Sequence, residues 1–344
     1  MKKLLLLLPF GLLITACSND FDVTAPWKEI PVVYGILSPQ DTAHYIRVEK
    51  AFLDPEKSAL AIAQIADSLY YPENAIAVFL ERTDNQSRIQ LQRVNGALEG
   101  YPRDPGVFAG QPNWLYKAKS TGSFSILGGK TYRLVIERSD NRDDITAETT
   151  LPKDFVVTQP NLSTQVPVIT FEKTSPGTPI QWLTDINGYF FNVTFRIRYF
   201  EKNLNGTIAS THELVWEQAT NIIRDDMLSG NGVYKVTENI PKNSFYNFLA
   251  KNMDRPGPNL YREFQSIDLI IDGGGKEIKE YLDTYEVNGN ITGAETFPNY
   301  TNISEGYGIF TSKNRTVVEG LKVKSTTIDS MNISSITDTL GFKY

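Results

Sequence analysis

The sequence is poor in the residues that most often carry covalent or metal chemistry. It contains one cysteine and two histidines among 344 residues. A single cysteine excludes an intramolecular disulfide, so the fold must be held by apolar cores. Two histidines, His44 and His212, without any Gly-x-Ser-x-Gly sequence, leave little from which to build a serine or metal hydrolase. These scarcities disfavour an enzyme of a familiar type.

An excess of positive charge is also missing. The chain has 34 Lys and Arg against 40 Asp and Glu, a formal net charge of −6. Nucleic-acid binding needs a clustered basic surface that exchanges for condensed counterions. We therefore expect no nucleic-acid partner.

Two short segments approach known site motifs and fail at a required position. His212-Glu213 begins like a zinc-protease helix, but Trp216 stands where the second metal ligand must be. The run Gly273 to Lys276 lacks both the Ser or Thr and the upstream glycine of a phosphate-binding loop. We expect no catalytic residue, no metal and no cofactor.

Long apolar runs are absent as well, and the longest is Leu4 to Ile14. Its eleven residues, at ~1.5 Å rise each, are too short to cross a hydrocarbon core of ~30 Å. Lys2 and Lys3 precede it, and Thr15 and Ala16 supply the small residues before Cys17. This pattern predicts a signal peptide over residues 1–16 that ends in a lipobox.

Cys17 would become the first residue of the mature chain and carry acyl chains such as palmitate. Several acyl chains act as an effectively permanent anchor, because each buried CH₂ contributes about 0.8 kcal/mol. The alternative is an ordinary secretory signal in which the cysteine stands by chance.

Residues 17–28 are expected to form a tether. The residues directly after the cysteine resemble the acidic export signal of Bacteroidota surface lipoproteins: Ser18, Asn19, Asp20, Phe21 and Asp22. The resemblance implies a lipid-anchored protein exposed at the cell surface, on the outer face of the outer membrane. The alternative is a solvated acidic tether on a lipoprotein that faces the periplasm.

The rest of the chain is rich in the residues that strands favour. It contains 17 Tyr and 18 Phe, many in runs that alternate with polar residues, which is typical of half-buried strands. We predict a mainly β fold with two domains, a β-sandwich over residues 29–153 and an antiparallel β-rich domain with a few short helices over residues 181–344. Residues 154–180, which contain Pro, Ser and Thr, are expected to be the linker.

In the first domain, strands are predicted over Ile30–Leu37 and Ala43–Ala51, with Pro31 marking an edge strand or a strand's start. A loop helix is expected within Leu60–Tyr70, and a hairpin from Ala75–Arg82 and Arg88–Arg93. In the second domain we predict a long strand over Gly188–Lys202 that pairs with a strand near His212–Glu217. Helices are expected over Asn243–Asp254 and Lys276–Tyr285, and a short strand over Ile267–Ile271. Phe310 and Val317–Val323 are expected to close the sheet.

The segment Gly96–Thr121 is rich in Gly, Pro and aromatic residues, and we interpret it as a long ordered loop. Loops beyond ~12–15 residues without secondary structure are usually functional or disordered, and aromatic residues argue against disorder. Tyr101, Trp114 and Tyr116 are therefore candidate partner-binding residues. They could equally pack the loop onto its own domain.

Two further segments carry a family resemblance. The first joins Leu127-Gly128-Gly129-Lys130-Thr131-Tyr132-Arg133-Leu134 to the exit Thr149-Thr150-Leu151-Pro152, and the second is Thr301-Asn302-Ile303-Ser304-Glu305-Gly306-Tyr307-Gly308-Ile309-Phe310. In this order they resemble a family of Bacteroidota surface lipoproteins of uncharacterised function. The resemblance implies an immunoglobulin-like or transthyretin-like first domain and a TonB-dependent transporter as the neighbouring outer-membrane protein. The Gly96–Thr121 segment departs from the family pattern.

Several surface positions could be modified or bind an ion. Asp140, Asn141, Asp143 and Asp144 offer oxygen ligands suited to Ca²⁺, although the same residues favour a plain hairpin turn. Four triplets match the Asp-Ser/Thr-aliphatic pattern of Bacteroidota O-glycosylation, with acceptors at Thr42, Ser68, Ser330 and Thr339.

Together these features favour a non-catalytic surface lipoprotein that acts as a binding or accessory partner of a TonB-dependent transporter. A structural or adhesive surface lipoprotein without a transporter is the alternative, and an enzyme of unfamiliar type is a third.

Overall fold

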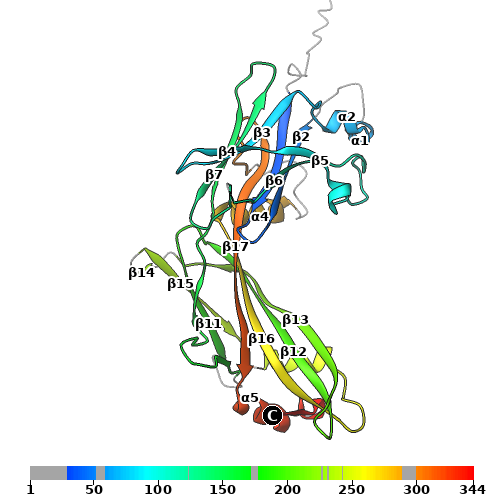
Figure 1. The fold of residues 1–344 in the computed structure, drawn as a ribbon, viewed down its shortest axis with the longest axis vertical. Helices are drawn as coiled ribbons and strands as arrows, with labels where there is room; N and C mark the ends of the chain where they lie inside the picture. Colours follow the sequence, from blue (N-terminus) through cyan, green and yellow to red (C-terminus); the bar gives the residue numbers. More distant parts are fainter. Residues whose placement is uncertain are drawn as a thin grey trace, which may run out of the picture.

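The computed structural model describes residues 29–51, 59–122, 124–171, 177–225, 228–230, 232–241, 243–288 and 300–344. Cys17 and the export-signal residues lie outside this part of the chain. The predicted mainly β fold with a few short helices is confirmed. Two β-rich units lie end to end along the long axis of the molecule (Figure 1).

The first unit is a sandwich of two sheets. One sheet contains β1 (Ile30–Leu37), β2 (Ala43–Ala51), β6 (Trp114–Lys119) and β5 (Gln92–Asn95), in that order. The other has the order β4 (Ser87–Gln90), β3 (Ile76–Arg82), β7 (Thr131–Arg138) and β8 (Ile145–Thr150). Their facing side chains form one apolar core, which includes Val33, Ile46, Val78, Leu134 and Tyr116.

The first two strands match their predicted bounds, and β1 is not an edge strand. It lies between β2 and a late strand of the chain, β17 (Tyr307–Val323). Pro31 is the second residue of β1 and precedes the first residue paired with β17. Its missing N–H therefore costs no hydrogen bond in that ladder.

The predicted loop helix is two short helices, α1 (Ala59–Ala63) and α2 (Ala66–Leu69). The predicted hairpin over Ala75–Arg93 is shorter than expected, because the chain changes sheets at the buried residue Leu91. Residues up to Gln90 pair with β3, and residues from Gln92 pair with β6.

The second unit packs a large antiparallel sheet against a small one. The large sheet contains β12 (Phe190–Asn203), β13 (Ile208–Ile223), β16 (Leu260–Gly274) and the second half of β17. The small sheet has the order β14 (Leu228–Gly230), β15 (Val233–Ile240), β11 (Thr178–Thr184) and β9 (Val156–Gln159). Helices α3 (Ser244–Asn252) and α5 (Ser325–Ile333) add Phe245, Leu249 and Met331 to the core around Trp182 and Phe195.

Part of the expected linker belongs to this unit. Strand β9 and the first residues of β11 lie within residues 154–180, and β10 (Val168–Ile169) pairs with the end of β17. Ile169 and Phe171 are buried in the second core. The Pro, Ser and Thr content of residues 154–180 is typical of a linker, so composition alone does not indicate these short strands.

Strand β17 belongs to both units. Its first half pairs parallel to β1, and its second half pairs antiparallel to β16. The expectation that Phe310 closes the second sheet is therefore wrong, because Phe310 pairs with Gly35 and is buried in the first core. One ten-stranded sheet consequently runs through the whole molecule.

The two segments that carry the family resemblance meet in this first unit. Thr146 N donates to Ser304 Oγ (2.7 Å), and Ser304 N donates to the carbonyl of Thr146 (2.8 Å). Asn302 Nδ2 donates to the carbonyl of Glu148, while its Oδ1 accepts from the Phe310 N–H. Residues about 150 positions apart therefore close one side of the sandwich together.

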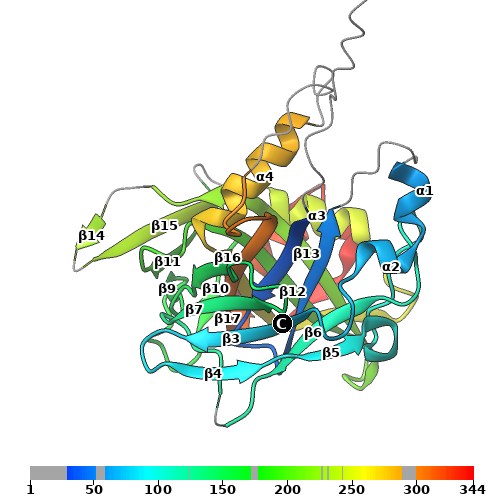
Figure 2. The same ribbon diagram turned by 90° about the horizontal axis from the view of Figure 1, so that it is seen from above.

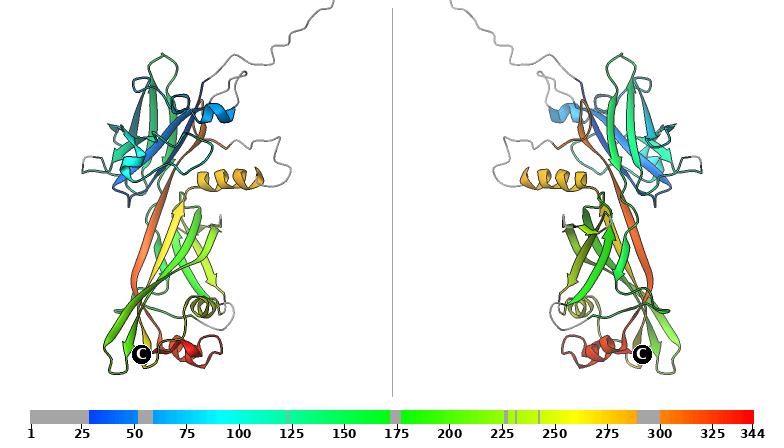
Figure 3. Two further views of the ribbon diagram at one scale, coloured as in Figure 1. Left: turned by 90° about the vertical axis from the view of Figure 1, so that its right-hand side faces the viewer. Right: turned by 90° about the vertical axis from the view of Figure 1, so that its left-hand side faces the viewer.

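Gly273 and Gly274, expected in a turn, are the last residues of β16. Helix α4 (Lys276–Asn288) follows them and projects from the waist between the two units (Figure 3). Seen from above, α1 and α2 lie on one side of the molecule, beyond β2 (Figure 2). In the described part of the chain, no helix is both long and apolar enough to span a membrane.

Candidate binding site

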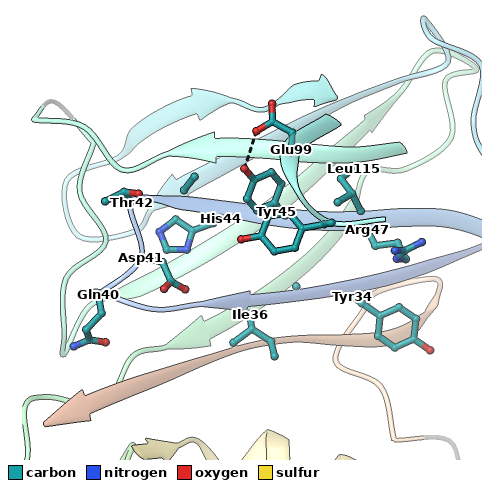
Figure 4. Close-up of a pocket in the computed structure, with 13 residues that line it drawn as sticks. Tyr34, Ile36, Gln40, Asp41, Thr42, His44, Tyr45, Arg47, Glu99 and Leu115 are labelled. Carbon is teal, nitrogen blue, oxygen red and sulfur yellow. Dashed lines mark hydrogen bonds between the residues drawn. The ribbon is translucent and has the colours of Figure 1, made fainter. Parts of the chain in front are cut away.

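A groove of about 660 Å³ lies on the outer face of the first sheet. Its lining comes from β1, β2, the turn between them, the segment that follows β5 and the start of β6, and includes Tyr34, Ile36, Asp41, Tyr45 and Glu99. Tyr45 lies near its centre, with Ile36 and Tyr34 of β1 on one side and Glu99 on the other (Figure 4).

The alternation of the two strands creates this outer face. In β1, Val33, Gly35 and Leu37 point into the core, which leaves Tyr34 and Ile36 exposed. In β2, Ile46 and Val48 point inward, and Tyr45 and Arg47 therefore face outward. Ile36 is 49% exposed, a high value for an isoleucine in a central strand.

The second wall of the groove is the segment between β5 and β6. A short 3₁₀ helix, η1 (Gly96–Glu99), ends at Gly100, whose φ of +88° favours glycine. Tyr101 follows, and its ring lies 4.7 Å from that of Tyr45, tilted by 53°. Tyr101 is 55% exposed, so this pair of rings presents aromatic surface to solvent.

Buried polar contacts hold this wall in place. Asn113 Nδ2 donates to the carbonyl of Tyr101 (2.8 Å). Arg103 pairs with the buried Glu49 of β2 (2.8 Å) and also donates to Tyr70 Oη (3.0 Å). The expected ordered loop is therefore present, over residues 100–113.

Glu99 joins the wall to the sheet. It accepts a hydrogen bond from Tyr45 Oη (2.9 Å) and pairs with Lys117 of β6. The Lys117 ammonium holds the pKa of the Glu99 carboxyl below its ordinary value. Burial, together with Glu99, raises the pKa of the Tyr45 phenol. Glu99 therefore stays charged and Tyr45 stays protonated at neutral pH.

His44 and Asp41 lie together at one end of the groove (Figure 4). His44 is 2% exposed, and neither ring nitrogen has a hydrogen-bond partner. Burial lowers its pKa against the opposing effect of Asp41, so the ring is neutral at pH 7. Among the described residues, the Asp41 carboxylate has neither an ion pair nor a hydrogen-bond partner.

The opposite end of the groove carries Arg47 (Figure 4). Arg47 and Arg103 share the carboxylate of Glu49, at 2.9 and 2.8 Å. Two guanidinium groups on one carboxylate leave a surplus of one positive charge at this end, which balances Asp41 at the other. Beyond Arg47, the ring of Tyr34 meets that of Tyr281 from α4 edge to face at 6.4 Å.

The three aromatic residues predicted to bind a partner do not form one surface. Tyr101 lies on the groove, as described. Trp114 and Tyr116 are not in a loop, because both belong to β6. Tyr116 is buried in the core, and Trp114 is half-buried beneath the Arg93 guanidinium, 4.6 Å from the ring centre. Sequence reasoning missed Tyr45, Asp41 and Glu99, although the alternation of β2 already placed Tyr45 opposite the buried residues.

The other predicted positions are scattered. Cys17 and Ser18 to Asp22 lie outside the described residues. Among the candidate O-glycosylation acceptors, Thr42 and Thr339 are exposed, whereas Ser68 and Ser330 are half-buried. Thr42 lies at the groove. In the Asp140–Asp144 turn, the Asp140 carboxylate pairs with Arg142 and the Asp143 carbonyl accepts from Arg138. No group of three His, Cys, Asp or Glu suited to a metal occurs among the described residues.

A serine, a histidine and a glutamate do meet on the second unit. Ser210 Oγ lies 2.7 Å from His212 Nε2, and Glu201 Oε2 lies 3.5 Å from the same nitrogen. A catalytic relay needs the serine and the acid on opposite nitrogens of the ring. Glu201 is instead held by Arg262 (2.8 Å). The cluster therefore has the geometry of a surface polar network.

No family model and no curated protein matches this chain. Among solved structures, the C-terminal globular domain of an oligosaccharyltransferase from Pyrococcus abyssi aligns with 10% identity and a TM-score of 0.25, covering 68% of this chain and 44% of that one. Trypsin-activated alpha-2-macroglobulin from Escherichia coli aligns with 12% identity and a TM-score of 0.20, covering 72% of this chain and 14% of that one. The chain thus spans less than half of either structure, and similarity at this level carries no information about function.

Proposed function

We propose that this protein is a non-catalytic, lipid-anchored surface lipoprotein that holds a ligand in the groove around Tyr45. The observation that carries the proposal is the ordered aromatic wall beside that groove. Residues 100–113 are fixed by Arg103 and Asn113, yet Tyr101 remains exposed on Tyr45. An exposed aromatic ring on a well-anchored segment supplies contact area at low entropic cost, which suits recognition.

A binding role fits the chemistry of the groove better than a catalytic one. Its acid Glu99 is neutralised by Lys117 and fixed by Tyr45. Its histidine, His44, is buried without an orienting partner on either nitrogen. A general base needs an oriented, accessible proton-accepting group, and neither residue offers one.

The membrane anchor is proposed from the lipobox. The Cys17→Ser variant should remain folded and be released from washed membranes, because acylation is the sole anchor in this account. A folded variant that stays with the membranes would reject the anchor. Circular dichroism of the released protein is the control for folding.

The outer face of the outer membrane is proposed from the acidic residues after Cys17. Replacing Asn19, Asp20 and Asp22 by Ala should transfer the protein to the periplasmic face while its membrane association stays unchanged. Protease added to intact cells should then digest the parent and spare the variant. Equal digestion of both proteins would contradict the export signal.

The partner proposed is a TonB-dependent transporter, for which the protein acts as an accessory lipoprotein. Chemical cross-linking of intact cells, followed by purification of the tagged full chain from detergent, should recover such a transporter in stoichiometric amount. Recovery of the anchored, surface-exposed protein without a transporter would instead favour the structural or adhesive alternative.

A further inference from the structure

We infer that the ligand of the groove is a neutral, hydroxyl-rich molecule of the saccharide class. The inference rests on the proposed binding function and adds the chemistry of what is bound. Three independent properties of the groove carry it: its charge balance, its aromatic and apolar surface, and the unpartnered carboxylate of Asp41.

The charges around the groove cancel. Glu99 is paired with Lys117, and the surplus positive charge of Arg47 and Arg103 on Glu49 balances Asp41. Sites for polyanions or polycations are lined by one sign of charge, which raises the local concentration of the ligand. A balanced groove offers no such attraction and favours a ligand without net charge.

The surface of the groove combines aromatic faces with aliphatic floor. Tyr45 and Tyr101 form a tilted pair, and the exposed Ile36 lies across from them. Aromatic rings carry a negative face that attracts the positive edges of C–H bonds. A sugar ring has such C–H groups on one face and hydroxyl groups around its rim, so it can stack on the tyrosines while its hydroxyls remain directed at polar side chains.

A carboxylate without a partner among the described residues lies at the end of the groove where that rim would be. Asp41 is exposed there and lines the groove. An ionised carboxylate accepts hydrogen bonds and donates none. A ligand hydroxyl group can donate to it, which a purely apolar or purely anionic ligand cannot do.

The size of the groove is consistent with this class. Its volume of about 660 Å³ lies within the range of roughly 300–1,000 Å³ for small-molecule sites. The groove therefore accommodates a short saccharide or the end of a longer one.

The test uses the full lipoprotein in detergent and a printed array of neutral, acidic and amino-group-bearing glycans. We expect retention on neutral glycans, and titration calorimetry with the best of them should give a measurable Kd. Tyr101→Ala should weaken this binding by roughly tenfold or more, since it removes one stacking face. Leu98→Ala is the matched control, because Leu98 lies in the same wall, is 87% exposed and does not line the groove; it should bind like the parent.

Retention on acidic or amino glycans alone, or on no glycan, would overturn the saccharide assignment. Equal affinity of the Tyr101→Ala variant and the parent would overturn it as well. A protein that fails here but still recovers a transporter from cross-linked cells would leave the proposed accessory function standing, so the two failures are distinguishable.

Discussion

Gly308 lies directly against the backbone of Val33: a Cβ atom added to this glycine would stand 1.9 Å from the Val33 carbonyl oxygen. Its φ of +110° is one that side-chain-bearing residues rarely adopt. The contact allows β17 to run alongside β1, and β17 then continues from the first unit into the second.

We therefore expect Gly308→Ala to lower the free energy of unfolding by about 2–5 kcal/mol, since it combines backbone strain with a steric clash. Gly100→Ala is the control: its φ of +88° is similar, but nothing lies within 4 Å of an added Cβ. It should cost only about 1–2 kcal/mol. Urea unfolding followed by circular dichroism measures both, and equal losses would show that the close approach to Val33 is relaxed at little cost.

Asn314 of β17 makes four side-chain hydrogen bonds where the two units meet, three of them to other segments of the chain. Its Nδ2 donates to the Pro152 carbonyl and to Asp154, and its Oδ1 accepts from Gln40 Nε2 and from the Arg315 N–H. The side chain is fully buried, so its removal leaves several of these groups without a partner.

Asn314→Ala should consequently cost about 2–4 kcal/mol. It should also separate the thermal unfolding of the two units into two transitions, because the bridge between β17 and the ends of β1 and β8 is lost. Asn205→Ala, in the exposed turn between β12 and β13, should cost less than about 1 kcal/mol. A single transition with parent-like stability in the Asn314 variant would contradict this role.

His44 should make stability depend on pH. Burial lowers its pKa below 6.5 in the folded protein, so below pH 6.5 the unfolded chain binds a proton at His44 that the folded protein does not. The free energy of unfolding therefore falls as the pH falls from 6.5 toward the lowered pKa. His44→Gln, which cannot titrate, should lose less stability between pH 7.5 and pH 5.5 than the parent. Parallel pH profiles of the two proteins in chemical unfolding would refute the effect.

Local pattern was sufficient to predict most strands of the first unit. The alternation in residues 30–37 and 43–51 determines which side chains are buried, and the observed strands have these bounds. The pairing of β17 with β1 was not predictable in the same way, because the partners are more than 270 residues apart and nothing local in Phe310 indicates which core it enters. The segment from Asn302 to Phe310 holds the residues that specify this pairing. Gly308 permits the close approach to β1, and the Asn302 side chain hydrogen-bonds both the N–H and the carbonyl of Phe310.

The binding site was predicted only in part for a related reason. The aromatic composition of the Gly96–Thr121 segment predicts a binding surface there, and Tyr101 of this segment does lie at the groove. Trp114 and Tyr116 have the same composition signal but continue into β6, where strand alternation buries Tyr116. Tyr45 joins the site because β2 runs next to β6, and Asp41 joins it from the turn that precedes β2. Strand order cannot be deduced from either segment alone.

If the outer face of the first sheet is the recognition surface, filling the groove must weaken binding. Ile36→Trp places a large ring on its floor, and Val215→Trp places the same ring on β13 of the second unit, where Val215 is 58% exposed. The measurement is the Kd of each full-length variant for the neutral glycan that the parent retains best. We expect Ile36→Trp to lose at least tenfold in affinity, roughly 1.4 kcal/mol or more, and Val215→Trp to bind like the parent. Equal affinities in the two variants would contradict this expectation.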